Sequence, residues 1–302
     1  KITVNPEIDM KVLSPAKINL TLEILGREEN QYHEISSIMQ TLDLFDEMSF
    51  NLSSDISVTT DNEILSNEQN NLSYKAAKLL KDSLKLDKGV HISIKKKIPI
   101  AAGLGGGSSN AATTLICLNK IWDLNLSVIE LSKIGSELGS DIPFFLTGGT
   151  SLVSGQGEAI RELPMPNLPW FLIISPNIKL ENKTSQLYKM VESSHFTSGA
   201  LTRKLEARIR GGGDVPPQFF FNVFDKIAPS AFQEITLITD ELRSLGLREV
   251  HLCGSGPALF CPIERKEMAT AIKLIIERKL KISTYLTTAL KRYSGSPNDG
   301  NS

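Results

Sequence analysis

Glycines and serines are concentrated in "PIAAGLGGGSSNAATTL" (99–115), where three successive glycines lead into two serines and an apolar segment. Because glycine lacks a Cβ, a ligand can approach its main chain closely, and several N–H groups can point at one anion. The helix predicted from about Ser108 to Trp122 adds unpaired N–H groups and the positive end of its dipole. The stretch therefore predicts a phosphate site, with Ser108 or Ser109 as a candidate Mg²⁺ ligand.

Two common phosphate-binding patterns fit this stretch poorly. A Walker A loop requires a lysine after its last glycine, whereas Ser108 and Ser109 follow Gly107 directly. A Rossmann fingerprint requires a third glycine where this chain has Ser108, and Pro99 interrupts the strand that should lead into it. A loop without a ligand is the remaining alternative, and the entropic cost of ordering three glycines makes it less favourable.

Asp141 and Lys17 are two charged residues for which the sequence alone leaves a structural and a chemical interpretation open. Asp141 follows a predicted helix stop and precedes "IPFF", so apolar walls are expected to raise the pKa of its carboxyl and let it accept a proton. A helix cap or turn acceptor is the structural alternative. Lys17 and Asn19 share the polar face of the alternating stretch 16–24, a pattern that also fits a solvated strand.

Alternation and helical spacing outline the elements that position these groups. Strands are expected at 16–24, 46–53, 55–60, 89–100, 170–176 and 283–290, helices at 70–86, 127–139, 184–192, 228–246 and 266–279, short strands and turns at 141–163, and a strand–glycine turn–strand at 248–263. The proline-dense "LPMPNLP" (163–169) is interpreted as a linker. The prediction is an α+β chain with lobes at 1–163 and 164–293, followed by a disordered tail at 294–302.

Three motifs occur in the order found in the GHMP small-molecule kinases, which include galacto-, homoserine and mevalonate kinases. "PIAAGLGGGSSNAA" resembles the central signature of that family, "SPAKINL" (14–20) its first motif and "CGSGPALF" (253–260) its third. The resemblance implies a ribosomal-S5-like N-terminal lobe, a ferredoxin-like C-terminal lobe and a site between them. It also implies ATP with Mg²⁺ as the phosphoryl donor.

Four segments resemble one branch of the family, whose substrate is a small molecule with a cytidine diphosphate group. They are "PAKINL" (15–20), "YHE" (32–34), "GLGGGSSNAA" (103–112) and "GSDIPFF" (139–145). The implied activity is ATP-dependent phosphorylation of a substrate hydroxyl in the non-mevalonate route to isoprenoid precursors. Another GHMP kinase, acting on mevalonate, homoserine or a sugar, is the first alternative.

The resemblance also assigns roles residue by residue. Asp141 would be the catalytic base with Lys17 beside it, and the ATP-binding residues would be Asn71, Leu72, Lys97, Pro99, Gly103, Leu104, Gly105, Gly106, Gly107, Ser108, Ser109, Asn110 and Ala111. The substrate would contact Asn19, Tyr32, His33, Asp141, Thr184 and Gly254.

Among the roles that the resemblance implies, cytosine recognition is the one for which this sequence departs most from the family pattern. Tyr32 would stack on the cytosine ring and His33 would contact its edge, although a packing tyrosine and a surface histidine are the plain alternatives. Gln31 stands where the family usually has glycine, and Tyr188 is the candidate for a second stacking ring. "CGSGPALF" predicts a hairpin turn whether or not it has a function. The resemblance adds backbone contacts of this turn near the transferred phosphate.

Composition limits the partners. The chain has 33 Lys and Arg residues against 34 Asp and Glu, a formal net charge of −1, which gives no overall attraction to nucleic acid or to an anionic membrane. A non-catalytic RNA-binding module, the second alternative, would need a basic face that "KKK" (95–97) alone does not supply. Three widely spaced cysteines indicate free thiols in a reducing compartment, and the expected location is the cytoplasm. The expected oligomeric state is a monomer or a homodimer.

Overall fold

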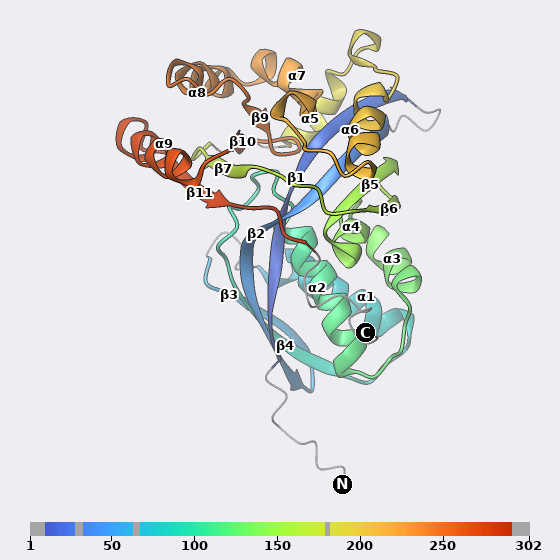
Figure 1. The fold of residues 1–302 in the computed structure, drawn as a ribbon. Coiled ribbons are helices and arrows are strands. Elements are labelled where there is room, and N and C mark those ends of the chain that lie inside the picture. Colours follow the sequence, from blue (N-terminus) through green and yellow to red (C-terminus); the bar gives the residue numbers. More distant parts are fainter. Residues whose placement is uncertain (1–9, 28–32, 63–66, 179–181, 292–302) are drawn as a thin grey trace.

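The computed structural model describes residues 10–27, 33–62, 67–178 and 182–291 (Figure 1). Its longest elements are β1 (Met10–Arg27) and β2 (His33–Ser53), which pair antiparallel along most of their length. Around them lies a seven-stranded sheet in the order β3-β4-β2-β1-β8, with β5 paired to β2 and β6 to β5. The added strands are β3 (Ile56–Thr60), β4 (Gly89–Lys95), β5 (Thr150–Gly155), β6 (Ala159–Leu163) and β8 (Phe221–Asn222).

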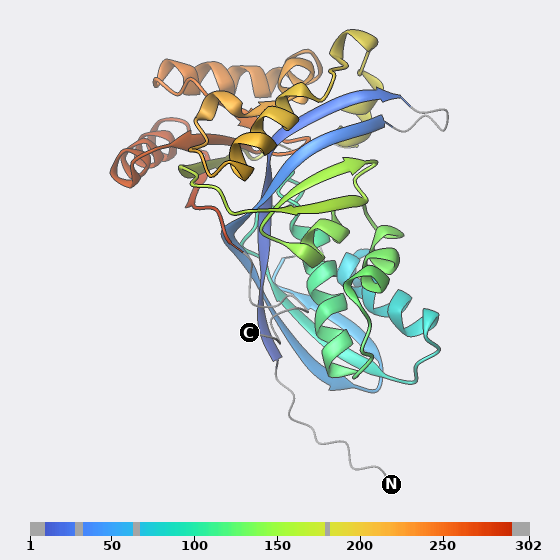
Figure 2. The same cartoon turned by 45° about the vertical axis from the view of Figure 1, so that its right-hand side comes forward.

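Four helices pack against one face of this sheet, as Figures 1 and 2 show: α1 (Leu72–Ser83), α2 (Gly106–Ile121), α3 (Val128–Ser136) and α4 (Ile142–Thr147). Phe50 and Ile92 from the strands form a buried cluster with Leu80, Leu115 and Phe144 from the helices. Local signals start two of these helices: Asn71 caps α1, and Ser127 with Glu130 forms a capping box on α3.

A second, four-stranded sheet has the order β11-β7-β10-β9. Its strands are β7 (Trp170–Ser175), β9 (His251–Leu252), β10 (Leu259–Ile263) and β11 (Ser283–Thr287). The helices of this part are α5 (Lys183–Lys189), α6 (Ala200–Arg210), α7 (Phe224–Ala231), α8 (Gln233–Ser244) and α9 (Lys266–Lys279). Short 3₁₀ turns lie before α1, at Glu68–Asn70, and in the C-terminal part, at Ser193–His195 and Pro217–Phe219.

β1 joins the two parts. Its apolar face, with Ile18 and Leu20, packs in one cluster with Phe171 and Phe260 of the second sheet. β8 comes from the C-terminal part of the chain, yet it pairs parallel with β1 through Phe221 and Thr21. The two sheets therefore share a core, and the lobe boundary after residue 163 stays a prediction.

Three expectations about local structure were wrong or incomplete. Residues 142–147 form α4 instead of a strand or turn, because Pro143 suits the first turn of a helix and the following phenylalanines pack against the helical layer. The helix α6 was not expected, although its buried residues Thr202, Leu205 and Ile209 recur at helical spacing. The polar face of β1 is buried, with Lys17 only 4% and Asn19 only 2% exposed.

The prediction of free, buried cysteines is confirmed, whereas the helix expected at 228–246 is divided at Phe232 into α7 and α8. Cys117, Cys253 and Cys261 are free and buried. No described helix is both long enough and apolar enough to span a membrane. Tyr32 and the tail predicted at 294–302 lie outside the described residues.

Candidate active site

The central glycine loop is fixed between β1 and the β9–β10 turn. Lys17 N–H donates to the carbonyl of Leu104 (2.9 Å), and Ala258 N–H donates to that of Ala102 (3.2 Å). Gly103 has φ of +86°, and a Cβ built on it would lie 1.8 Å from the carbonyl oxygen of Cys253. Only glycine fits there, so the three motifs that lie far apart in the sequence meet at one point.

The start of α2 is arranged to receive an anion. Gly105, in the left-handed region with φ of +73°, is the N-cap residue, and no side chain caps the helix. Ser109 N–H donates to Gly105 O (2.9 Å), which leaves the N–H groups of Gly106, Gly107 and Ser108 ahead of that bond. The first turn contains no acidic residue. The dipole and these donors together favour a phosphate group.

A cavity of about 380 Å³, here called the loop cavity, lies beside this helix start. Predicted nucleotide ligands that line it are Asn71, Leu72, Pro99, Gly103, Leu104, Gly105, Gly106, Gly107, Ser108 and Asn110. Lys96 lines it too, whereas the side chain of Lys97, which was predicted to do so, is not among its lining groups and pairs with Glu47. The lysine in the cavity is thus the neighbour of the predicted one.

Two of the predicted nucleotide ligands support the loop from behind. Ser109 is fully buried and its Oγ shares a hydrogen bond of 2.8 Å with Ser14 Oγ, while Ala111 is fully buried in the helical layer. Asn110 Nδ2 donates to Ser14 Oγ and to Asp46 Oδ2, both at 3.0 Å. Lys96 pairs with the buried Asp46, which also accepts from the N–H groups of residues 97 and 98. This network fixes β1, β2 and α2 to one another under the loop.

Lys17 and Asp141 form the charged centre of the site. Lys17 Nζ lies 3.4 Å from Asp141 Oδ2 and donates to Asn19 Oδ1 at 2.8 Å. Asn19 is held in turn by its hydrogen bond to Ser37 Oγ (2.8 Å). Asp141 occupies the N-cap position of α4, but its side chain makes no capping hydrogen bond. Its carboxylate is 29% exposed and faces Lys17, while Phe144 and Phe145 belong to the buried cluster of the helical layer.

The Lys17–Asp141 pair lines a second cavity of about 340 Å³, here called the transfer cavity. Asn19, Thr184 and Gly254, all predicted substrate ligands, line it as well. Gly254 is held close, since a Cβ on it would lie 3.3 Å from Lys17 Nζ. Thr184 Oγ1 shares a hydrogen bond of 2.7 Å with Ser255 Oγ, which ties α5 to the β9–β10 turn.

A third cavity of about 950 Å³, here called the outer cavity, is lined by two rings that contact each other. The centroids of His33 and Tyr188 lie 5.1 Å apart with an interplanar angle of 38°, and Tyr188 also meets Phe224 edge-on at 5.1 Å. Burial, with a smaller effect of Arg27, lowers the pKa of His33, and its Nε2 is buried without a partner among the described residues. Burial and the charge of Asp141 raise the pKa of Tyr188 to about 12. Both rings are therefore neutral at pH 7.

The three cavities are contiguous. The loop and transfer cavities share Ala101, Gly103, Gly105 and Ser108, and the transfer and outer cavities share Ile35, Ser140, Gln156 and Tyr188. The charged pair therefore lies midway between an anion-binding loop and an aromatic recess. This order suits the transfer of a phosphoryl group between two bound molecules.

Sequence reasoning missed several residues that line the loop and transfer cavities: Lys96, Ser140, Gln156, Lys183 and Ser255. Lys96 follows a strand whose alternation ends at Lys95, and no periodicity shows which way the next side chain turns. Lys183 adjoins Thr184, which the resemblance did select. Its position next to Thr184 was the only signal in the sequence that could have selected Lys183.

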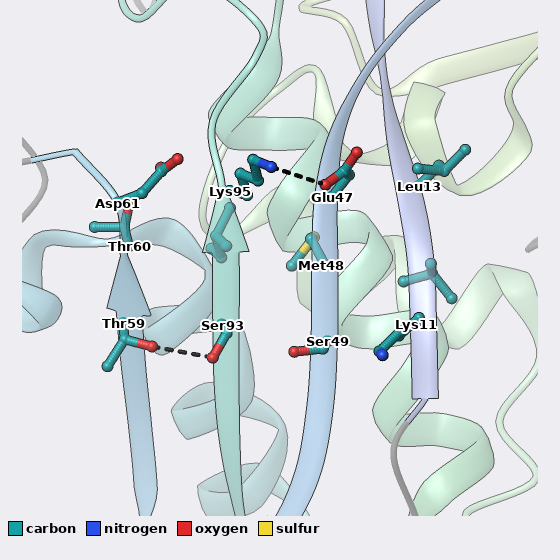
Figure 3. Close-up of a pocket in the computed structure, with 12 residues that line it drawn as sticks. Lys11, Leu13, Glu47, Met48, Ser49, Thr59, Thr60, Asp61, Ser93 and Lys95 are labelled. Atoms are coloured by element: carbon teal, nitrogen blue, oxygen red, sulfur yellow. Dashed lines mark hydrogen bonds and ion pairs between the residues drawn. The ribbon is translucent and has the colours of Figure 1, made fainter.

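A separate hollow of about 760 Å³ lies on the outer face of the seven-stranded sheet (Figure 3). It is bordered by polar side chains such as Ser49, Ser93 and Thr59, while the alternate residues Phe50 and Ile92 point to the helices. Thr59 Oγ1 and Ser93 Oγ are 3.1 Å apart, and Lys95 pairs with Glu47. None of the predicted site residues that the structure describes lines this hollow.

Comparison with known proteins agrees with this geometry. Residues 71–149 match the GHMP kinases N terminal domain family. Among curated proteins, the 4-diphosphocytidyl-2-C-methyl-D-erythritol kinase of Dehalococcoides mccartyi is 37% identical over 87% of this chain and 92% of its own length. The Bacillus cytotoxicus protein of the same name is 38% identical over 83% of this chain and 88% of its own length.

Solved structures give the same result. A 4-(cytidine 5'-diphospho)-2C-methyl-D-erythritol kinase superposes with a TM-score of 0.78 and 28% identity, covering 93% of this chain and 99% of its own. The homoserine kinase of Cytophaga hutchinsonii, at 18% identity, shares the fold with a TM-score of 0.67 over 98% of both chains. The mixed α+β GHMP kinase fold is thus confirmed, and the chain belongs to the 4-diphosphocytidyl-2-C-methyl-D-erythritol kinase family within the GHMP kinases.

Proposed function

We propose that this protein transfers the terminal phosphoryl group of ATP to the 2-hydroxyl of 4-diphosphocytidyl-2-C-methyl-D-erythritol. The observation that carries the proposal is the Lys17–Asp141 pair at 3.4 Å, located between the glycine loop and the His33–Tyr188 recess. ATP extends from the loop cavity, and the cytidyl alcohol extends from the outer cavity. Both reacting groups then meet in the transfer cavity.

Asp141 acts as the proton acceptor. Its carboxylate has no capping bond to break and is accessible from the cavity, so it can accept the proton of the attacking hydroxyl. The hydroxyl oxygen attacks the terminal phosphorus in line, and ADP leaves with the electron pair of the broken P–O bond. No covalent intermediate on the enzyme is required.

Lys17 stabilises negative charge at the same point. Its ammonium, held by Asn19 and Asp141, neutralises charge on the moving phosphoryl group. The N–H groups of Gly106, Gly107 and Ser108 hold the nucleotide phosphates at the helix start. Both features act mainly by positioning and by electrostatic stabilisation, which is what phosphoryl transfer demands.

Substrate recognition is assigned to the outer cavity. Tyr188 offers a ring face to cytosine, and the neutral His33 has a free buried nitrogen for the base edge. Thr184, Gly254 and Asn19 line the path from this recess to the charged pair. Tyr32, which was predicted to stack on the cytosine ring with Tyr188 as the second ring, lies outside the described residues.

Magnesium is proposed to accompany ATP. The described residues contain no cluster of three carboxylate, histidine or cysteine ligands, so a cage of protein ligands is absent there. Ser108 lies where the loop and transfer cavities meet and can add its hydroxyl to the phosphate oxygens and waters that Mg²⁺ prefers, whereas Ser109 is bound to Ser14. When bound, the ion would neutralise charge on the phosphates.

A substrate panel tests the proposal. With ATP and Mg²⁺, the cytidyl alcohol should be phosphorylated, and homoserine, mevalonate and simple sugars should not. Phosphorylation of one of these instead of the cytidyl alcohol would contradict the substrate assignment and retain the GHMP chemistry. Location in the cytoplasm and a monomeric or homodimeric state remain predictions; size-exclusion chromatography with light scattering measures the latter.

A further inference from the structure

Lys183, the first residue of α5, places a second ammonium group in the transfer cavity. Its Nζ donates a hydrogen bond to the carbonyl oxygen of Gly256 in the β9–β10 turn. The same turn approaches Lys17, because a Cβ on Gly254 would lie 3.3 Å from Lys17 Nζ. The two lysines, from β1 and from α5, thus border one small cavity on the side of the same glycine turn.

The charges around Lys183 are not balanced in the described part of the chain. Lys17 has Asp141 as its partner, whereas no described carboxylate forms an ion pair with Lys183. The titratable groups that surround it are Lys17 on β1, Asp141 before α4, Cys253 after β9 and Tyr188 on α5. Burial and the charge of Lys17 lower the pKa of Lys183 to about 8. A partly buried ammonium beside another one is unfavourable until an anion enters.

We propose that Lys183 is a second catalytic cation, which binds the phosphoryl group during its transfer; this inference rests on the proposed kinase activity. In the reaction the bond between the terminal phosphorus of ATP and its bridging oxygen breaks, and a bond to the substrate oxygen forms. The electron pair leaves with ADP, and the hydroxyl proton passes to Asp141. The ammonium of Lys183 gives up its hydrogen bond to the Gly256 carbonyl and donates one to a phosphoryl oxygen instead. Lys183 itself is not chemically changed.

The position of Lys183 favours the moving phosphoryl group over the diphosphate of the acceptor. Lys183 lines the transfer cavity with Lys17 and Gly254 and does not line the outer cavity. Among the described residues, the cations that line the outer cavity are Arg27 and Lys189. A carbonyl oxygen is a neutral acceptor, so a phosphoryl oxygen forms the stronger, charge-assisted bond.

Kinetics of Lys183→Met and Lys183→Arg test the role, with Lys204→Met as the control. Lys204 is exposed on α6 and lines none of the three cavities, so its variant removes the same charge elsewhere. Lys183→Met should lower kcat about 10²- to 10³-fold, as for removal of a donor to a developing charge, with KM for the cytidyl alcohol nearly unchanged. Lys183→Arg should restore part of kcat. Thermal unfolding checks that all variants fold.

The pH profile separates an electrostatic role from a structural one. In the wild type, kcat/KM for ATP should fall above about pH 8, because the free ammonium loses its proton there. Lys183→Arg should remove this basic limb, since a guanidinium stays charged. Calorimetry in buffers of different ionisation enthalpy should show proton uptake at pH 8.5 when a non-hydrolysable ATP analogue binds the wild type, but not when it binds Lys183→Met.

Failure of the inference can be told from failure of the proposed function. If the wild type does not phosphorylate the cytidyl alcohol, the proposed function is wrong. If the wild type does so and Lys183→Met matches Lys204→Met in kcat, both KM values and proton uptake, then Lys183 has no role in transfer. An effect confined to KM for the cytidyl alcohol would place the ammonium on the acceptor diphosphate and overturn the assignment.

Discussion

The ammonium nitrogen of Lys17 lies 3.4 Å from Oδ2 of Asp141, and the two groups come from a central strand and from the start of a short helix. Lys17 is held by Asn19 within the strand, and its own N–H is bonded to the glycine loop. The backbone of the loop therefore holds the lysine that faces the proposed base. Lys17 thus links the proposed phosphate site to the proposed proton acceptor.

Replacement of Asp141 by asparagine should lower kcat about 10³-fold, because the amide cannot accept the hydroxyl proton. The dissociation constant of a non-hydrolysable ATP analogue should change less than about threefold, since the glycine loop is untouched. Steady-state kinetics and calorimetry measure the two quantities. Asp82→Asn, which alters an exposed carboxylate on α1, is the control. Turnover close to that of the control would refute the base assignment.

Glycine loop geometry gives a prediction about stability. Gly103→Ala should lower the free energy of unfolding by about 3 kcal/mol, since φ of +86° strains alanine and its Cβ meets the backbone of Cys253. Gly107→Ala should be neutral or stabilising, because its Cβ would lie 3.4 Å from Leu72 Cδ1 in a helical turn. Denaturant unfolding of both variants measures the difference. An equal loss of the free energy of unfolding in the two variants would mean that strain at residue 103 is not the cause of the destabilisation.

The sequence predicted the glycine loop and the helix after it correctly because both depend on local rules. Glycine spacing and a following helix define an anion site in any fold. The partnership of Lys17 with Asp141 came only from the family resemblance, since nothing local shows that a strand residue meets a residue across the chain. Burial of Lys17 was not expected, because alternation alone cannot show that both faces of a strand are covered.

The remaining errors also have physical causes. Choosing Lys97 in place of Lys96 is a register error of one residue, and in extended chain one residue reverses the side of the backbone. Ser109 and Ala111 belong to the same motif as Ser108, yet they point inward, because a helix turns about 100° per residue. Motif membership therefore did not distinguish contact with the cavity from support of the loop.

Tyr188 gives a prediction about substrate binding. Tyr188→Ala should raise KM for the cytidyl alcohol about 10- to 100-fold, the range expected for loss of one base–aromatic stack. Tyr188→Phe should keep KM within about threefold, because the ring remains and the hydroxyl, whose pKa is about 12, carries no charge. KM for ATP should be unchanged in both. A comparable rise in the phenylalanine variant would show that the hydroxyl, and not the ring, recognises the substrate.

His33 makes substrate capture sensitive to acid. Its pKa is lowered by burial and by Arg27, so the neutral ring is favoured, and protonation at low pH places a charge beside Tyr188. At saturating ATP, kcat/KM for the cytidyl alcohol should fall as the pH drops below 6.5, the ordinary histidine value. His33→Gln should lose this part of the acid limb, whereas His195→Gln, whose ring lines none of the three cavities, should keep it.

The same shift affects stability, with a sign that can be checked independently. Because the folded state binds this proton less readily than the unfolded state, the contribution of His33 is fully present above pH 6.5 and is lost as the pH falls through its folded pKa. The free energy of unfolding of His33→Gln should therefore depend less steeply on pH below 6.5 than that of the wild type. Urea unfolding between pH 5 and about pH 7 measures this slope. Identical slopes in the two proteins would show that His33 titrates as it does in the unfolded chain, and the acid limb would then belong to another group.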